Sequence, residues 1–405
     1  MKHKISTQLD PTLARIKSAL PQGRFHTPSA GSSGFTGIVH LAAKDVLSPD
    51  ECMAYPDGPD TPVGAVIKYV AKSDADNEVV CTQLAQAFGL NAPVVQPASG
   101  KSASLFVSPM KREKAAFTLE PFDMLAMNLI RGTNLVDLCE SGRVFEFTQK
   151  QWNELLFEFG KTAVFDLFIG NFDRFVRFEL TASQEYELTS TAANLGNVML
   201  EFTPERGKGI RAAHMIDSTS LAREPKQPAV VDEDDLYTTG LFDPVQESVP
   251  VGTPPRSSHL PGGDTPERPI AEPLHRCFVN TIGGFLNGSP ELPAAILASI
   301  QTSLGADIRK SHGLGLENPK VSALFSKLNH GLPNLFSGIQ AGIERLTSID
   351  FRHSPELQST LSNNTRLAGL LRKNLEGVDR ESAKAIPRTS SGRRISMHEL
   401  MHGFL

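Results

Sequence analysis

The chain has 405 residues, 40% of them hydrophobic, and a formal net charge of −5. This length allows two lobes with cores of their own, and the charge balance gives no reason to expect nucleic acid or an anionic membrane as a partner. The four cysteines are scattered, without the paired spacing of a zinc site or a disulfide framework, which favours a reducing, cytoplasmic compartment. No run of about 18 or more apolar residues occurs, so no transmembrane segment is expected.

The N-terminal residues 1–33 are polar and rich in Ser and Thr, which predicts a flexible leader. The first 20 residues, "MKHKISTQLDPTLARIKSAL", lack the continuous apolar core of a cleavable secretory signal. An unstructured leader of this kind also suits an effector that bacteria inject into the cytoplasm of a host cell. Both locations follow from composition alone and are carried as expectations.

Residues 34–125 have the pattern of a small β-rich lobe. The runs "GFTGIVHLAAK" and "VGAVIKYVAK" are apolar and β-branched and are bounded by Gly, Pro and Asp, so they predict strands. The segment "DADNEVVCTQLAQAFGL" has apolar residues at helical spacing and a glycine near its end, so it predicts a helix. The runs "APVVQPAS" and "SASLFVSPM" are expected to be further strands.

Residues 126–222 are expected to form a mainly helical second lobe, in which "TQKQWNELLFEFGKTAVFDLFIG" is the strongest helix. Residues 223–274 hold ten of the 28 prolines and the acidic run "DEDD", which predicts a long irregular insertion. Helical periodicity returns over 275–385, and 386–405 are expected to be a flexible basic tail. A small β-rich N-lobe followed by a helical C-lobe and a helical C-terminal extension is the outline of the two-lobed protein-kinase-like fold, in the α+β class.

A phosphoryl-transfer site needs a cover and a cation on the phosphates, and an acid that holds this cation. The glycines of "GSSGFTG", Gly31, Gly34 and Gly37, could supply the cover, although a plain turn is an equally good interpretation. Lys68 is the one cation within the apolar strand "AVIKYV", and Glu78 follows ten residues later, where a helix is expected to begin. A lone lysine could merely extend to solvent. The pair of Lys68 and Glu78 is therefore a more specific sign of a phosphoryl-transfer site than either residue alone.

The second lobe supplies three further polar residues in order. Asp173 lies in "GNFDRF" directly after the apolar helix, and Phe172 and Phe175 beside it are expected to anchor the loop in the core. Asn197 lies in "NLGNVML" and Asp217 in "AAHMIDST", each at the boundary of an apolar strand. Each residue alone could be a cap or turn residue. Together they match an acceptor-orienting carboxylate and two oxygen ligands for a hard cation such as Mg²⁺.

The motifs "IGNFDR", "NLGN" and "HMID" resemble the catalytic motifs of the actin-fragmin kinase type. This atypical branch of the protein-kinase-like superfamily is close to the phosphatidylinositol 3- and 4-kinases and to HipA-type kinases. The segment "NEVVCTQLAQAFGLNAPVVQP" also resembles the helix and following strand of that branch, and the similarity covers residues 30–222. The resemblance implies ATP and Mg²⁺ as cofactors, with Mn²⁺ as a substitute. It implies these roles: Lys68 on the phosphates, Glu78 as its partner, Asp173 as catalytic carboxylate, Asn197 and Asp217 as metal ligands, and the backbone of Met127–Leu129 at the adenine.

The chain departs from that family in three places. In typical protein and lipid kinases the asparagine follows the aspartate by about five residues, whereas here the separation is 197 − 173 = 24. The glycine-rich cover matches poorly, and "IDST" stands where the kinases have Asp-Phe-Gly. These differences concern the phosphate loop and activation more than the five polar residues.

The expected function is transfer of the γ-phosphoryl group of ATP to Ser or Thr of a protein substrate, with an activating partner as an open expectation. The alternatives are a phosphoinositide kinase acting on a lipid headgroup and a pseudokinase that serves as a binding module. Kinase folds also host nucleotidyl and glutamyl transfer. A remote alternative is a zinc protease, because "HELMH" (His398 to His402) fits H-E-x-x-H with Glu399 as general base.

Overall fold

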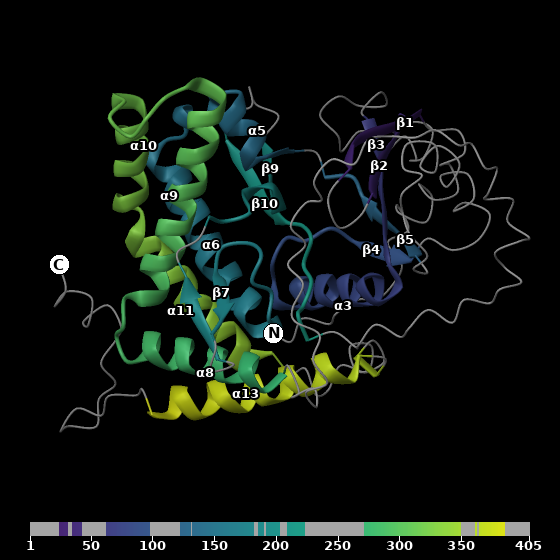
Figure 1. Ribbon diagram of the computed structural model, residues 1–405, viewed down its shortest axis with the longest axis vertical. Coiled ribbons are helices and arrows are strands. Elements are labelled where there is room, and N and C mark those ends of the chain that lie inside the picture. The colour runs from purple at the N-terminus through teal and green to yellow at the C-terminus, as the bar shows by residue number, and fades with distance from the viewer. Residues whose placement is uncertain are drawn as a thin grey trace, which may run out of the picture.

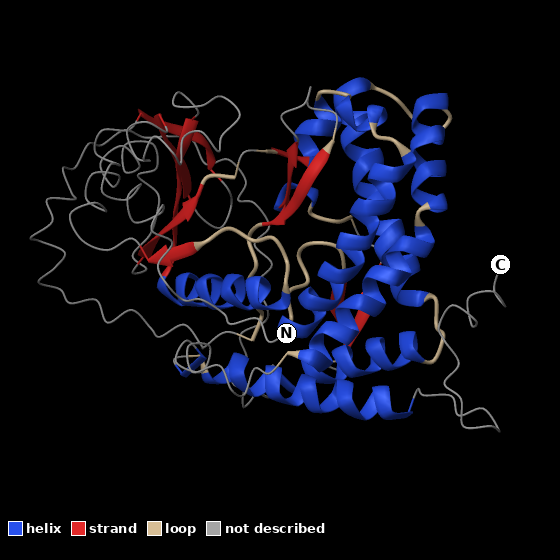
Figure 2. Cartoon of the chain, turned by 180° about the vertical axis from the view of Figure 1, so that it is seen from behind, coloured by secondary structure: helices blue, strands red, loops and turns tan. Residues whose placement is uncertain are grey.

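The computed structural model describes residues 24–30, 35–42, 62–97, 122–130, 132–181, 185–189, 192–202, 209–222, 271–349, 361–362 and 364–384. The described chain is a mixture of helix and strand, mostly helical and with small sheets, which agrees with the expected α+β class. Figures 1 and 2 show one sheet on one side of the molecule, with a single helix beneath it. The remaining helices lie together on the opposite side of the molecule. No helix within these ranges is long and apolar enough to cross a membrane.

The largest sheet has five antiparallel strands in the order β1-β2-β3-β5-β4. Its strands are β1 (Arg24–Ala30), β2 (Phe35–Ala42), β3 (Pro62–Ala71), β4 (Val95–Pro97) and β5 (Phe122–Asn128). The strands expected from "GFTGIVHLAAK", "VGAVIKYVAK" and "APVVQPAS" are confirmed, whereas "SASLFVSPM" lies outside the described residues. The structure corrects the expected leader 1–33, because Arg24–Ala30 within it pairs with β2.

Helix α3 (Lys72–Phe88) connects this sheet to the other described helices, which together are called the helical body. It begins at Lys72 rather than at Glu78 as expected. Near its start, Ala75 packs with Leu125 and Met127 of the sheet. Further along, Leu84 and Phe88 enter the core that the other helices share. The helix therefore has one apolar end on each part of the molecule, and Gly89 follows it in the left-handed conformation that suits a helix C-terminus.

Helix α6 (Gln149–Ile169) is the centre of the helical body, as its apolar sequence predicts. Thr148 and Gln151 form a reciprocal capping box at its start, and Gly170 with φ 73° ends it. Helix α11 (Leu332–Ser348) crosses α6 at close range, because Gly338 lies against the backbone of Phe157. The long helix thus has both ends fixed, and the chain leaves it at a defined point.

The other helices are α5 (Leu135–Glu140), α8 (Ala271–Leu286), α9 (Glu291–His312), α10 (Pro319–His330) and α13 (Thr365–Lys384), with the short 3₁₀ turns η4 (Arg143–Glu146) and η5 (Leu195–Asn197). Figure 1 shows α8 and α13 side by side along the lower edge. Because α8 begins at Ala271, the expected insertion 223–274 is too long at its end, and the helical region expected from 275 starts four residues earlier. Residues 223–270 and the tail 386–405, including "HELMH", lie outside the described residues.

Two smaller sheets complete the described fold. Strands β6 (Thr133–Asn134), β9 (Val198–Phe202) and β10 (Ile210–Met215) form a three-stranded antiparallel sheet in the order β10-β9-β6. Strands β7 (Arg177–Leu180) and β8 (Tyr186–Thr189) form a separate hairpin between α6 and β9. The loops that leave α6, precede β9 and follow β10 are the ones that carry Asp173, Asn197 and Asp217.

Candidate active site

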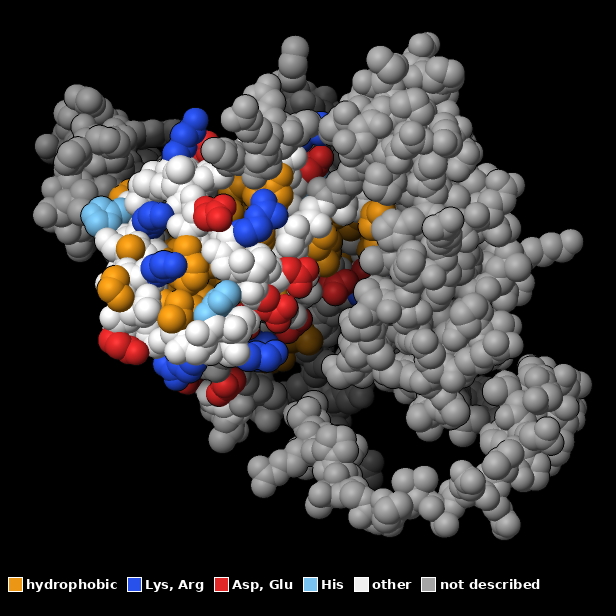
Figure 3. Space-filling model, turned by 90° about the horizontal axis from the view of Figure 1, so that it is seen from above, with side chains coloured by type: hydrophobic (Ala, Val, Ile, Leu, Met, Phe, Trp, Pro, Cys, Tyr) orange, Lys and Arg blue, Asp and Glu red, His pale blue; other side chains and the backbone are white. Residues whose placement is uncertain are grey.

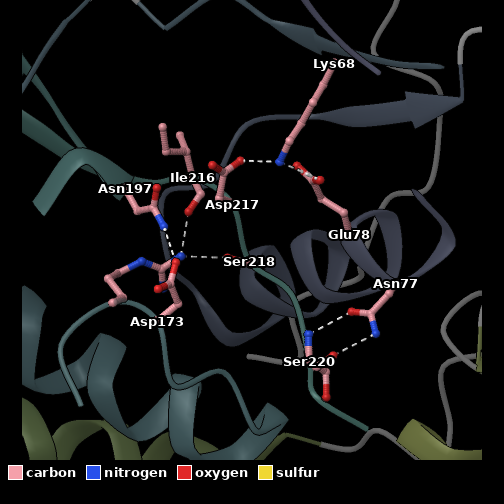
Figure 4. Close-up of polar contacts among 10 residues, drawn as sticks. Lys68, Asn77, Glu78, Asp173, Asn197, Ile216, Asp217, Ser218 and Ser220 are labelled. Atoms are coloured by element: carbon pink, nitrogen blue, oxygen red, sulfur yellow. Dashed lines mark hydrogen bonds and ion pairs between the residues drawn. The ribbon is translucent and has the colours of Figure 1, made fainter. Parts of the chain in front are cut away.

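Lys68 lies between two carboxylates that come from different parts of the chain (Figure 4). Its Nζ is 2.8 Å from Oε2 of Glu78 on α3 and 2.6 Å from Oδ1 of Asp217 after β10. The Glu78 side chain is buried, while the Asp217 side chain is 39% exposed. The structure therefore brings together three residues that the sequence placed in one site from positions as far apart as 68 and 217.

The charge of this lysine is held by its two partners. Burial by itself lowers the pKa of the Lys68 ammonium, but the negative charges and hydrogen bonds of Asp217 and Glu78 together outweigh burial, so the pKa is raised above its ordinary value. Lys68 is thus a permanent cation at neutral pH. It faces two carboxylates, of which Asp217 is the one that solvent can reach.

Asp173 lies in the loop that leaves α6, and its side chain is 59% exposed. Oδ2 accepts hydrogen bonds from Nδ2 of Asn194 at 3.0 Å and from Nδ2 of Asn197 at 3.4 Å. Oδ1 lies 3.5 Å from Nη2 of Arg177. The carboxylate is therefore oriented by donors on one side and still open to solvent.

The two phenylalanines beside Asp173 anchor the loop as expected. Phe175 is fully buried, with its ring centroid 4.6 Å from that of Phe159 in α6. Phe172 is partly buried, and its ring centroid is 4.6 Å from that of Phe178 in the hairpin. Apolar packing on both sides of Asp173 fixes the loop while its carboxylate points outward.

The long separation between Asp173 and Asn197 is explained by the hairpin β7–β8. The chain leaves the loop, forms the two strands, and returns so that N of Asn194 donates to O of Arg174 at 2.9 Å. This backbone hydrogen bond brings Asn194 and Asn197 back beside the carboxylate of Asp173. The separation of 24 positions between the aspartate and the asparagine is therefore no obstacle to contact.

Asn197 and Asp217 lie on neighbouring loops, because N of Ile216 donates to O of Asn197 at 3.1 Å. The Nδ2 group of Asn197 faces Asp173, which leaves the side-chain carbonyl oxygen for another partner. A carbonyl oxygen and a carboxylate are hard donors, and Mg²⁺ commonly takes one or two protein ligands together with phosphate oxygens and water. The donor set thus fits Mg²⁺, although the described ranges contain no group of three or more His, Cys, Asp or Glu placed to bind a metal.

The predicted nucleotide contacts other than Lys68 and Glu78 are less complete. Gly34 lies outside the described residues, and Gly37 is within β2 opposite Ile67, so it is a strand residue and does not form part of a loop. Met127 lies in β5 between β3 and β4, and Leu129 follows the end of that strand. In the chain, both residues precede β6 and α5, where the five-stranded sheet ends.

A buried polar network beneath Asp173 was not predicted from the sequence. Nη1 of Arg174 is 2.6 Å from Oδ1 of Asp166 in α6, and both side chains are almost completely buried. Asn171 donates to the same carboxylate oxygen, and its own Oδ1 accepts from N of Asp173. Burial raises the pKa of Asp166 to about 6, against the lowering effect of Arg174 and Asn171.

A second unpredicted contact joins α3 to the segment after Asp217 (Figure 4). Oδ1 of Asn77 accepts from N of Ser220 at 2.7 Å, and Nδ2 of Asn77 donates to O of Ser220 at 3.1 Å. The hydroxyl of Ser220 in turn donates to O of Ile169 at the end of α6. Since Asn77 precedes Glu78, this reciprocal pair fixes the helix that carries the partner of Lys68.

No protein-family model matches the chain, and no curated protein matches it significantly. The class that the fold defines is a mixed, mostly helical protein with small sheets. The polar residues of the candidate site, drawn in Figure 4, lie where the five-stranded sheet, helix α3 and the helical body meet (Figures 1 and 4).

Proposed function

We propose that the protein is an ATP- and Mg²⁺-dependent kinase that phosphorylates Ser or Thr of a protein substrate. The observation that carries the proposal is Lys68, which pairs with Glu78 and Asp217 beside the Asp173–Asn197 contact. Under this proposal the five-stranded sheet and α3 are the N-lobe of a two-lobed protein-kinase-like fold. The helical body is the C-lobe, with α8 to α13 completing it.

Each residue has a task that suits its surroundings. Lys68 would neutralise phosphate oxygens of ATP, and Glu78 would hold the lysine in place. Asn197 and Asp217 would hold Mg²⁺, which when bound supplies further neutralisation of the phosphates. The backbone near Met127 and Leu129 would contact the adenine.

Asp173 would orient the acceptor hydroxyl and receive its proton. In the transfer, the hydroxyl oxygen forms a bond to the γ-phosphorus, and the bond from that phosphorus to the bridging oxygen of ADP breaks. The exposed fraction of 59% leaves the carboxylate accessible, and the amides of Asn194 and Asn197 fix its direction. An accessible, oriented carboxylate supports an enzyme over a pseudokinase that only binds.

The test is phosphoryl transfer from labelled ATP by the purified full chain and by two variants. Asp173→Ala and Asp217→Ala are each expected to abolish labelling while the protein stays folded by circular dichroism. Asp217→Ala should also lose Mg²⁺-dependent ATP binding, whereas Asp173→Ala should largely keep it. The matched control is Asp379→Ala, an exposed aspartate of α13, which should label like the wild type.

Retained labelling in both site variants would overturn the assignment. Whole-cell extract and a lipid panel, used as acceptors, separate the alternatives: label in protein supports the proposed class, and label in lipid alone identifies a phosphoinositide kinase. Mg²⁺-dependent ATP binding by the wild type without any transfer identifies a pseudokinase. A stoichiometric zinc ion that is lost in His398→Ala would revive the protease alternative. A cytoplasmic location and delivery into a host cell are further proposals, and they rest on the composition of the chain.

A further inference from the structure

Arg174 contacts both loops that carry the acidic residues of the site. It follows Asp173 directly in the sequence, and its side chain is fully buried. One arm of its guanidinium, Nη1, pairs with Asp166. The other arm, Nη2, donates to O of Ile216 at 2.7 Å and lies 3.1 Å from Oγ of Ser218. Ile216 and Ser218 are the two residues on either side of Asp217, so one side chain joins the Asp173 loop to both neighbours of Asp217.

Asp217 has a backbone conformation that needs such support. Among the residues that the structure describes, it is the one residue other than glycine with positive φ, at 54°. For a residue with a side chain, this left-handed conformation is unfavourable, although aspartate tolerates it better than most. Such strain persists where the surroundings over-determine it. Here the hydrogen bonds to O of Ile216 and to Ser218 come from Arg174, and N of Ile216 is bonded to O of Asn197.

We propose that Arg174 is a positioning residue, whose Nη2 arm holds Asp217 in its left-handed conformation at a fixed spacing from Asp173. The inference rests on the proposed function for its effect on Mg²⁺, because Asp217 is the proposed metal ligand. Arg174 itself does not touch the nucleotide or the acceptor. Its role is to set where the carboxylate of Asp217 lies before the cation binds.

A purely structural role predicts something different. If Arg174 served only to balance the buried charge of Asp166, the Nη1 contact and the positive charge would be sufficient. Arg174→Lys keeps the charge but lacks the planar fork that reaches two groups at once. Ser218→Ala removes one acceptor of the Nη2 arm and leaves the Asp166 pair intact. Both variants therefore separate positioning from charge balance.

The first measurement is nucleotide binding as a function of Mg²⁺ concentration. It is monitored by the equilibrium binding of a fluorescent ATP analogue. A hydrogen bond to a charged group contributes about 1.5–3 kcal/mol, so losing the positioning contact should raise the half-saturating Mg²⁺ concentration by roughly tenfold or more. Arg174→Lys is expected to show this shift in full and Ser218→Ala in part, with metal-free nucleotide affinity within about twofold of the wild type. Arg211→Lys, which changes an exposed arginine of β10 paired with Glu201, is the matched control and should show no shift.

The second measurement needs no nucleotide. Hydrogen exchange of the free protein reports on the amide of Ile216, which is bonded to Asn197, and on the amide of Leu221, which is bonded to O of Gly170. Faster exchange at Ile216 in Arg174→Lys or Ser218→Ala, with unchanged exchange in the α6 helix, supports positioning. Unchanged exchange at Ile216 in both variants overturns it. Ser218→Ala keeps the test decisive if Arg174→Lys does not fold.

The two measurements distinguish failure of the inference from failure of the proposed function. If the wild type binds nucleotide with Mg²⁺ and both variants keep the same half-saturating concentration, Arg174 is not a positioning residue. If the wild type shows no Mg²⁺-dependent binding, the proposed function is wrong, and the exchange of the Ile216 amide alone decides whether Arg174 holds this loop.

Discussion

The close crossing of α6 and α11 predicts that a single methyl group will destabilise the protein. A Cβ added at Gly338 would lie 2.0 Å from O of Phe157 and 2.8 Å from its carbonyl carbon, where ordinary contact begins at 3.4 Å. The helices would therefore have to separate by 3.4 − 2.0 = 1.4 Å, because backbone lies on both sides and cannot rotate away. Overpacking of a core costs about 1–3 kcal/mol and occasionally more, and this case lies at the upper end. Replacing glycine by alanine within a helix returns about 1 kcal/mol.

We expect Gly338→Ala to lower the free energy of unfolding by about 2 kcal/mol or more. The assay is urea unfolding followed by circular dichroism, with Gly342→Ala as a milder case, since its nearest neighbour is the Val164 side chain at 2.9 Å. The control is Gly369→Ala in α13, where nothing lies within 4 Å of the added Cβ, so stability should rise by up to about 1 kcal/mol. A Gly338→Ala protein as stable as Gly369→Ala would refute the reasoning. Because α6 leads into the Asp173 loop, Gly338→Ala should also reduce labelling from ATP.

Two further predictions concern the buried polar contacts. Asn77→Ala leaves the N–H and C=O of Ser220 without their side-chain partner, so the free energy of unfolding should fall by about 2–4 kcal/mol. The control Asp76→Ala, on the exposed side of α3, should change it by less than about 0.5 kcal/mol. Equal free energies of the two variants in urea unfolding would contradict the stabilising role of Asn77. The raised pKa of Asp166, about 6 against 3.8 for the free group, means that the folded protein binds the proton more tightly than the unfolded chain. Its contribution is therefore complete below pH 3.8 and is lost as pH rises through about 6, a fall of about 3 kcal/mol. The difference in unfolding free energy between wild type and Asp166→Asn, measured across that range, should show this slope, and a flat difference would disprove it.

The sequence was sufficient to predict the residues that lie at the ends of regular elements. Asp173, Asn197 and Asp217 each end or precede an apolar run, so their place at the end of a regular element could be predicted from the pattern. Helix α6 follows from its apolar sequence and capping box, and the helices from Ala271 onward follow from their apolar periodicity. Strand β1 could not be predicted in the same way, because "RFHTPSA" has no apolar alternation and becomes a strand through pairing with β2.

Arg174 and Asn77 were missed for a different physical reason. The contacts that join them to the segment around Asp217 include backbone groups of Ile216 and Ser220, which the fold brings close from more than 40 and 140 positions away. A backbone carbonyl or amide carries no residue type, so no motif marks such a contact in the sequence. The left-handed conformation of Asp217 is equally invisible, since an aspartate at a strand end fits ordinary turns as well.

The hairpin β7–β8 has a consequence for how the length of this chain can change. Its base is closed by the backbone hydrogen bond between Arg174 and Asn194, at 2.9 Å, and Phe178 is packed against Phe172 beside it. The distance from Asp173 to Asn197 is therefore set at the base and does not depend on how many residues form the excursion. The entropic cost of a longer loop grows only slowly with its length. A tag or a binding segment inserted between the two strands is thus expected to leave the contact of Asp173 with Asn197 unchanged.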